Sequence, residues 1–177
     1  MTTSSSLTHV QFTVSPGNLS LLATCIDTLL PWVPYIRRDD LVAYRLSEDP
    51  SAGLVILRPI QAAEDLSRII DRCKRSIPDL DRALNRMATI AAELTDHVGF
   101  RVRSLDEWEQ LVSGFEHAAV SHPEWQLSVV APHRPRDPKA PTDRLYQAWL
   151  RIGLLGPIHN TLHVQCENPD TGSKATP

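Results

Sequence analysis

The feature that most constrains the fold is an internal repeat. The string His-Val-x-Phe-x-Val occurs at residues 9–14 and again at residues 97–102. Both copies alternate polar and apolar side chains with period two, which is typical of a β-strand with one buried face. In each copy a helical segment and three further strand-like runs follow. Such a duplication predicts two copies of one structural unit.

Hydrophobic spacing and turn residues divide each copy into the same elements. The first copy is predicted to hold a strand at 8–14, a helix at 19–30 and strands at 33–37, 41–46 and 53–58. The second is predicted to hold a strand at 97–102, a helix at 104–119 and strands at 125–131, 144–152 and 161–167. A Ser104-x-x-Glu107 capping box marks the start of the second helix. We therefore predict an α+β fold of two βαβββ modules, whose curled mixed sheets enclose a cleft.

The two copies also set the expected boundaries. We expect a first module at 1–60, a helical linker at 61–94, a second module at 95–168 and a polar, flexible tail at 169–177. Within the linker, Pro78 separates two predicted helices, at about 62–76 and 78–94. The charged faces of these helices are explained by solvation of a connecting hairpin. A partner-binding surface is the alternative.

Composition narrows the classes of partner. The chain has 177 residues and a formal net charge of −3, so it has no broad basic field to attract nucleic acid or anionic lipid. Its three cysteines are far apart and form no CxxC pair, which indicates a reducing compartment. The first residues lack a signal-peptide pattern, and no apolar run is long enough to cross a membrane. We expect a cytoplasmic protein without nucleic-acid or membrane partners.

The repeated unit, with a histidine opening each copy on the less apolar strand face, resembles the vicinal oxygen chelate superfamily. Its members include glyoxalase I, extradiol dioxygenases, fosfomycin-resistance thiol transferases and bleomycin-resistance binding proteins. The resemblance covers about 1–60 and 95–168. It implies a cleft between the two modules, in which a divalent metal is often held by ligands on the first and last strands. It also implies that dimerisation is common.

The same resemblance suggests a metal site formed by His9, His97 and His163. His9 and His97 fall on the two first-strand ligand positions, and the last-strand Glu of family metalloenzymes aligns with His163. The corresponding strand of the first copy, at 54–58, carries no carboxylate. Imidazole and carboxylate ligands suit Zn, Ni, Fe, Mn or Co.

Further residues on the same strand faces are candidates for catalysis and binding. Glu167, or His163 if it is not a ligand, is the candidate general base. The candidate substrate-binding residues are Gln11, Arg101, Tyr146 and Gln165. Structural alternatives remain open: the histidines as half-exposed strand-start residues, Glu167 as an exposed strand end and Arg101 as an ion-paired surface residue.

Two functions follow from these residues. One is a metal-dependent lyase, isomerase or oxygenase acting on a small oxygen-rich metabolite, which the matched His9 and His97 favour. The other is a metal-free small-molecule-binding protein of the bleomycin-resistance kind, or a metal-independent cyclase, which the apolar strand at 54–58 favours. Both predict a small-molecule ligand, and a homodimer is compatible with either.

Overall fold

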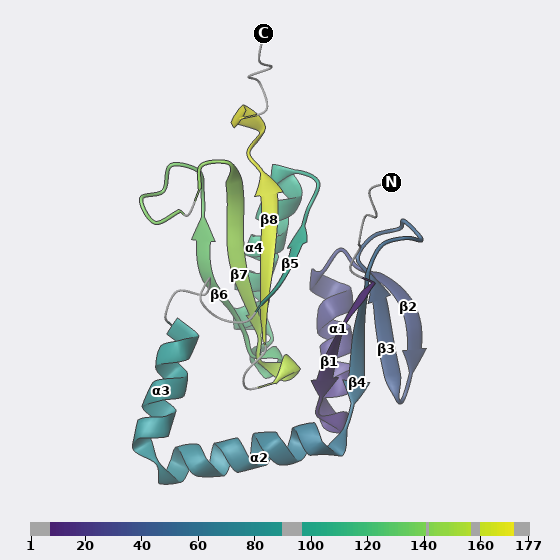
Figure 1. Ribbon diagram of the computed structural model, residues 1–177, viewed down its shortest axis with the longest axis vertical. Helices are drawn as coiled ribbons and strands as arrows, with labels where there is room; N and C mark the ends of the chain where they lie inside the picture. Colours follow the sequence, from purple (N-terminus) through teal and green to yellow (C-terminus); the bar gives the residue numbers. More distant parts are fainter. Residues whose placement is uncertain (1–7, 90–96, 141, 157–159, 172–177) are drawn as a thin grey trace, which may run out of the picture. The chain divides into compact units, whose positions relative to one another are not determined.

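The computed structural model describes residues 8–89, 97–140, 142–156 and 160–171, and the chain divides into two compact units (Figure 1). The first unit consists of residues 1–72 with 154–157, and the second of residues 73–153 with 158–177. Among the described residues no helix is both long and apolar enough to span a membrane.

The first unit is a four-stranded mixed sheet with one helix. In chain order its elements are β1 (His9–Val14), α1 (Leu19–Leu29), β2 (Val33–Arg38), β3 (Leu41–Arg45) and β4 (Leu54–Pro59). The strands lie in the order β1-β4-β3-β2. β1 and β4 are parallel, and the other neighbours are antiparallel.

The second unit repeats this arrangement. Its elements are β5 (His97–Arg101), α4 (Leu105–Ser121), β6 (Leu127–His133), β7 (Leu145–Ile152) and β8 (Thr161–Glu167). The strand order is β5-β8-β7-β6, again with a parallel pair formed by the first and last strands. The predicted α+β class with two βαβββ mixed sheets is confirmed.

The two sheets also share one register. His9 lies opposite Leu54 on β4, and His97 lies opposite Thr161 on β8. Counting from these pairs, each position on one sheet has a matched position on the other. The matched pairs include Leu41 with Gln147, Ala43 with Trp149, and Ile56 with His163.

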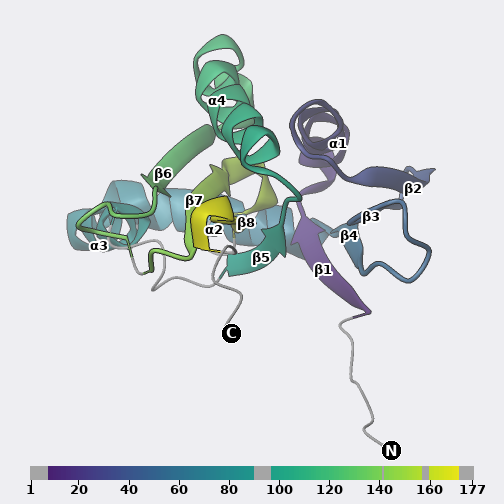
Figure 2. The same ribbon diagram turned by 90° about the horizontal axis from the view of Figure 1, so that it is seen from above.

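Each helix covers one face of its own sheet, as Figure 2 shows for both units. In the first unit Leu22 and Ile26 of α1 are buried, as are Phe12 and Val14 of β1, which the alternating pattern predicted. In the second unit the corresponding residues of α4 are Trp108, Leu111, Val112 and Phe115. The opposite face of each sheet, the open face, carries the other strand residues.

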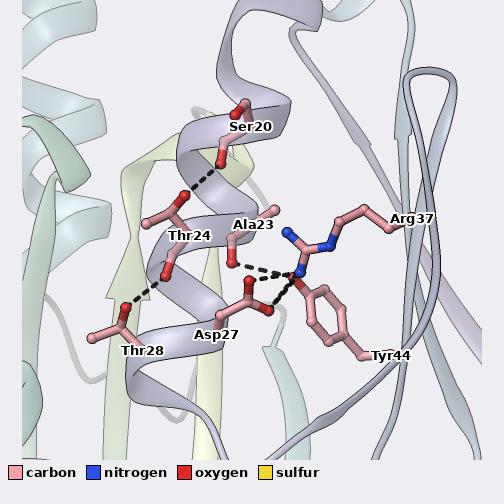
Figure 3. Close-up of polar contacts among 7 residues, drawn as sticks. All are labelled: Ser20, Ala23, Thr24, Asp27, Thr28, Arg37 and Tyr44. Atoms are coloured by element: carbon pink, nitrogen blue, oxygen red, sulfur yellow. Dashed lines mark hydrogen bonds and ion pairs between the residues drawn. The ribbon is translucent and has the colours of Figure 1, made fainter.

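A polar clamp ties the edge of the first sheet to α1 (Figure 3). The buried Tyr44 hydroxyl donates to the Ala23 carbonyl at 3.2 Å and lies 3.0 Å from Asp27 Oδ1. Arg37 of β2 donates to the same carboxylate at 2.6 Å. Burial, followed by the nearby Asp27 charge, raises the pKa of Tyr44, so the phenol stays protonated. The clamp therefore orients the sheet without contributing a reactive group.

The start of α4 follows the capping box only in part. The Ser104 side chain accepts a hydrogen bond from the backbone N–H of Glu107 at 3.2 Å, as predicted. The Glu107 carboxylate reaches back one residue further than expected, to the backbone N–H of Arg103 at 2.9 Å. It also accepts from the Arg103 side chain, and these bonds lower the pKa of Glu107. In contrast, Asn18 makes no side-chain cap at the start of α1.

Two helices follow the first sheet, α2 (Gln61–Ser76) and α3 (Pro78–Thr89), and Pro78 separates them as predicted. Residues 90–94 of the second predicted helix lie outside the described residues. The prediction of a strand at 125–131 began too early. Pro123–Trp125 forms a 3-10 helix and Gln126 has a left-handed backbone, so β6 starts at Leu127.

Candidate functional site

The open face of the second sheet carries a cluster of aromatic and polar side chains, the histidine cluster, made of His97, Gln147, Trp149, His163 and Gln165. Gly99 of β5, His163 of β8 and Trp149 of β7 lie side by side in one row across three strands. His97 and Gln165 point to the same face because they are two residues from members of that row. The strand pairing alone therefore brings these side chains together.

The rings of the cluster pack in a defined geometry. The imidazole of His163 stacks on the indole of Trp149, with ring centroids 4.3 Å apart and planes 8° apart. His97 meets His163 edge-on, with a centroid distance of 5.1 Å. Gly99 has no side chain, and even a Cβ there would stand 4.0 Å from His163 Nδ1. A Cβ at this position would be in ordinary van der Waals contact with His163, so only a larger side chain would crowd the imidazole.

Two amides compete for one nitrogen of His163. Its Nε2 lies 3.2 Å from Gln147 Oε1 and 3.4 Å from Gln165 Nε2. A neutral imidazole nitrogen either donates or accepts, so it donates to Gln147 in one tautomer and accepts from Gln165 in the other. The site can therefore hold His163 in either neutral form, and a ligand can select between them.

The surroundings keep His163 uncharged. Burial, followed by the proximity of His97, lowers its pKa to about 4. At neutral pH the ring is therefore a neutral donor or acceptor of hydrogen bonds, and a proton on it is strongly disfavoured.

The cluster is unusual because it is polar and buried at once. Gln147, Trp149, Thr161 and His163 are each less than 8% exposed. Among the described residues the buried indole N–H of Trp149 has no hydrogen-bond acceptor. An unmet buried donor costs roughly 1–3 kcal/mol, which a ligand oxygen or an ordered water would recover.

The structure places the other predicted site residues outside the cluster. Arg101 and Glu167 are both exposed and form an ion pair at 2.6 Å. Arg101 is therefore placed as an ion-paired surface residue, which was the structural alternative to a binding role. Tyr146 lies on the helix-facing side of β7, with its ring 5.6 Å from that of Trp108. This placement does not bring Tyr146 to the open face, where we expected substrate.

Two further candidates belong to the first unit. His9 is exposed at the start of β1, with its Nδ1 3.2 Å from the Thr8 hydroxyl. Gln11 follows on the same face of that strand and lies opposite Ile56. Each therefore lies on the open face of the first sheet, as the alternation predicted.

The residues of the second unit do not by themselves form a complete metal site. Among the described residues no group of three or more His, Cys, Asp or Glu side chains is placed to hold a metal ion. His97 and His163 could supply two nitrogen ligands, but the neighbours of His163 are amides, and Glu167 is engaged by Arg101. A three-ligand site of the predicted kind therefore does not fit this cluster alone.

Sequence reasoning missed the contribution of β7. Neither Gln147 nor Trp149 was among the site residues predicted from the sequence. The signal was present in the strand at 144–152, where Gln147 and Trp149 share a face by period two. Pairing this strand antiparallel to the strand at 161–167 places both residues next to His163.

Comparison with known proteins identifies the fold. No protein family model matches the sequence, and no curated protein matches it either. Solved structures do match. A glyoxylase/bleomycin resistance protein/dioxygenase domain from Frankia sp. EAN1pec is 14% identical with a TM-score of 0.52, and the match covers 94% of this chain and all of that one.

Two further structures are similar to the chain at comparable scores. The fosfomycin resistance protein FosX from Listeria monocytogenes, solved with Mn(II) and sulfate, is 8% identical over 95% of this chain and 94% of its own, with a TM-score of 0.53. Lactoylglutathione lyase from Agrobacterium tumefaciens is 13% identical over 92% and 94%, with a TM-score of 0.51. The chain therefore has the fold of the vicinal oxygen chelate superfamily, as the repeat predicted.

Proposed function

We propose that this chain is a small-molecule-binding protein whose ligand is held by the histidine cluster of the second sheet. The observation that carries the proposal is the stack of Trp149 and His163, buried together with Gln147 on a face that α4 does not cover. Burying amides and imidazoles costs free energy unless they are fully bonded. A binding role explains why this face keeps them.

The chemistry of the cluster suggests a ligand with at least one hydrogen-bond acceptor. Among the described residues the indole N–H of Trp149 lacks an acceptor, and the neutral ring of His163 can donate or accept a hydrogen bond at pH 7. Arg101, at the end of β5, is already paired with Glu167. A binder of the bleomycin-resistance kind, in a reducing, cytoplasmic setting, fits these features.

A second candidate is a metal-dependent lyase, isomerase or oxygenase. It is favoured by the matched positions of His9 and His97 in their sheets and by the contact between His97 and His163. A divalent metal such as Zn, Ni, Fe, Mn or Co would polarise adjacent substrate oxygens when bound. In that case His97 and His163 would hold the metal from this unit, and Glu167 would need to leave Arg101 to act as a base.

Ligand-dependent melting separates the two candidates. Bleomycin, fosfomycin and lactoylglutathione would be tested against the purified chain, once with EDTA and once with added Ni(II), Zn(II) or Mn(II). A ligand that binds the folded state raises the melting temperature by mass action. Our proposal predicts a shift that survives EDTA. A shift that needs metal would favour the enzyme instead.

The site itself is tested with Gln147→Leu, which installs the residue of the matched position, Leu41. This variant removes one hydrogen-bond partner of His163 and should weaken ligand affinity about tenfold, the equivalent of one hydrogen bond of about 1.4 kcal/mol. Val120→Ser, at an exposed position of α4, is the control and should bind normally. Equal binding by all three proteins would contradict the proposal.

A further inference from the structure

One more imidazole lies beside the histidine cluster, on β6. His133 lies directly opposite Gln147 of β7, so the two side chains share the open face of the second sheet. The ring of His133 meets the indole of Trp149 edge-on, with centroids 5.5 Å apart and planes 77° apart. Each of the four strands therefore contributes one ring to a continuous row of contacts: His97, His163, Trp149 and His133.

Two of these rings carry a buried nitrogen that makes no hydrogen bond. Within the described part of the chain neither Trp149 Nε1 nor His133 Nδ1 has a hydrogen-bond partner, and both atoms are shielded from solvent. Trp149 is 1% exposed, and the side chain of His133 is 12% exposed. Buried polar atoms are normally bonded, so two unmet nitrogens on rings in contact indicate a place for a polar group.

A carboxylate lies at the same place, on the turn that follows β6. Asp137 Oδ2 is 3.8 Å from His133 Nδ1, which is too far for a hydrogen bond. The other oxygen, Oδ1, accepts from the backbone N–H of Lys139 at 3.0 Å. The backbone N–H of Asp137 itself donates to the Arg134 carbonyl at 3.0 Å. The turn therefore holds the carboxylate beside the imidazole, with Oδ2 as the oxygen nearer the ring.

The chemistry of these three groups suits a hydroxyl. The indole N–H of Trp149 can only donate, and the carboxylate of Asp137 can only accept. The imidazole of His133 contacts the indole and lies next to the carboxylate. A hydroxyl accepts from an N–H and donates its own proton to a carboxylate at the same time. A carbonyl or ether oxygen has no proton to donate, and an ammonium group cannot accept.

We propose that Trp149, His133 and Asp137 form a hydroxyl-binding subsite of the histidine cluster, so that its ligand is an alcohol or a phenol. The proposal rests on the binding function proposed above and adds the β6 side of the sheet to the site. In this arrangement the ligand hydroxyl accepts from the indole N–H and spans the gap between His133 Nδ1 and Asp137 Oδ2.

Phenol is the probe, and anisole is its matched control because a methyl group replaces the hydroxyl hydrogen. The chain has four tryptophans, so isotopic labelling of tryptophan gives four indole N–H signals in a nuclear magnetic resonance spectrum. The Trp149 signal is the one that Trp149→Phe removes and that His163→Ile, which lacks the stacked imidazole, shifts. Phenol should move this signal to lower field. Anisole should bind about tenfold more weakly, the equivalent of one hydrogen bond.

Two variants test the polar partners of the hydroxyl. His133→Phe keeps a ring against Trp149 but removes the nitrogen, so it should abolish the preference for phenol over anisole. In Asp137→Asn the amide oxygen still accepts from Lys139, so the amide NH₂ replaces the acceptor Oδ2 and the preference should fall severalfold. His117→Phe makes the first change at an exposed position of α4 and should keep the preference.

The outcomes separate this subsite from the proposed function. Equal binding of phenol and anisole to the unaltered chain, or an unchanged preference in His133→Phe, would overturn the subsite. A Trp149 signal that phenol does not move would overturn it too. If bleomycin, fosfomycin or lactoylglutathione then still raises the melting temperature, the binding function stands without the hydroxyl subsite. If neither phenol nor any of these ligands binds, both proposals fail.

Discussion

The two sheets have the same topology and register but differ in chemistry at three matched positions of their open faces. Where the second sheet has Gln147, Trp149 and His163, the first has Leu41, Ala43 and Ile56 at the matched positions. Only small or aliphatic side chains occupy the first set, and only hydrogen-bonding side chains occupy the second. The difference supports our proposal that the repeated backbone is a scaffold and that the second copy carries the ligand site.

The comparison also separates residues that serve the fold from residues that serve a ligand. On the helix-facing side both sheets carry the same kind of buried apolar residues. Packing against the helix explains why apolar residues occupy that side. At these three positions the first sheet has no imidazole, indole or amide, so the sheet can form without them there. The histidine cluster is therefore best explained by a requirement other than folding.

Removing the stacked indole should have the largest effect. Trp149 is 1% exposed and packs against both His163 and His133. Trp149→Ala should lower the free energy of unfolding by about 3–5 kcal/mol, since it combines lost burial with a large cavity. Urea unfolding followed by far-UV circular dichroism measures this change.

The matched control is Tyr35→Ala in the first unit. Tyr35 is 49% exposed and contacts the Arg45 guanidinium at 4.2 Å, so its truncation should cost no more than about 1 kcal/mol. If both variants lose equal stability, the buried stack is not the feature that distinguishes the second sheet.

The imidazole of His163 should give the second unit a pH dependence of its own. Its pKa falls from 6.5 to about 4 on folding, so between these values the unfolded chain binds more protons than the folded one. Stability therefore falls as pH drops from about 6.5 to about 4, and this contribution is constant above 6.5. The full loss is up to about 3.5 kcal/mol, from about 2.5 pKa units at 1.4 kcal/mol each.

Because carboxylates titrate in the same range, the test is a difference between two proteins. His163→Ile installs the residue of the matched position and should flatten the profile between pH 6.5 and 4 relative to the unaltered chain. Ile56→Val, on the first sheet, removes no titratable group and should keep the original slope. Parallel profiles for the unaltered chain and His163→Ile would show that His163 is not held neutral by its surroundings.

The fold was predictable because its signals are local and occur twice. Strand alternation in His9–Val14 and 97–102, together with one helix per copy, was sufficient for the βαβββ order. The predicted strand at 125–131 began too early because the left-handed backbone of Gln126 delays the start of β6. This backbone conformation has no periodicity that the sequence reveals.

The candidate site was harder to predict because it depends on pairing between distant strands. His97 and His163 were identified from their strand faces, and the structure brings them into contact. Their partners Gln147 and Trp149 come from β7, and the sequence alone does not show that β7 pairs with β8. Tyr146 was expected on the open face, yet its position is one residue out of phase with Gln147 and it packs against Trp108.

The smallest effect is expected at the ion pair of Arg101 and Glu167, whose matched positions in the first unit are Thr13 and Ile60. Both side chains are more than half exposed, so solvent screens their attraction. A double-mutant cycle with Arg101→Ala and Glu167→Ala should give a coupling of about 0.2–1 kcal/mol that shrinks with added salt. A coupling that is larger and insensitive to salt would mean that the pair is shielded from water. Glu167 would then be a buried, orientable carboxylate, and the functional part of the second sheet would extend beyond the histidine cluster to the end of β8.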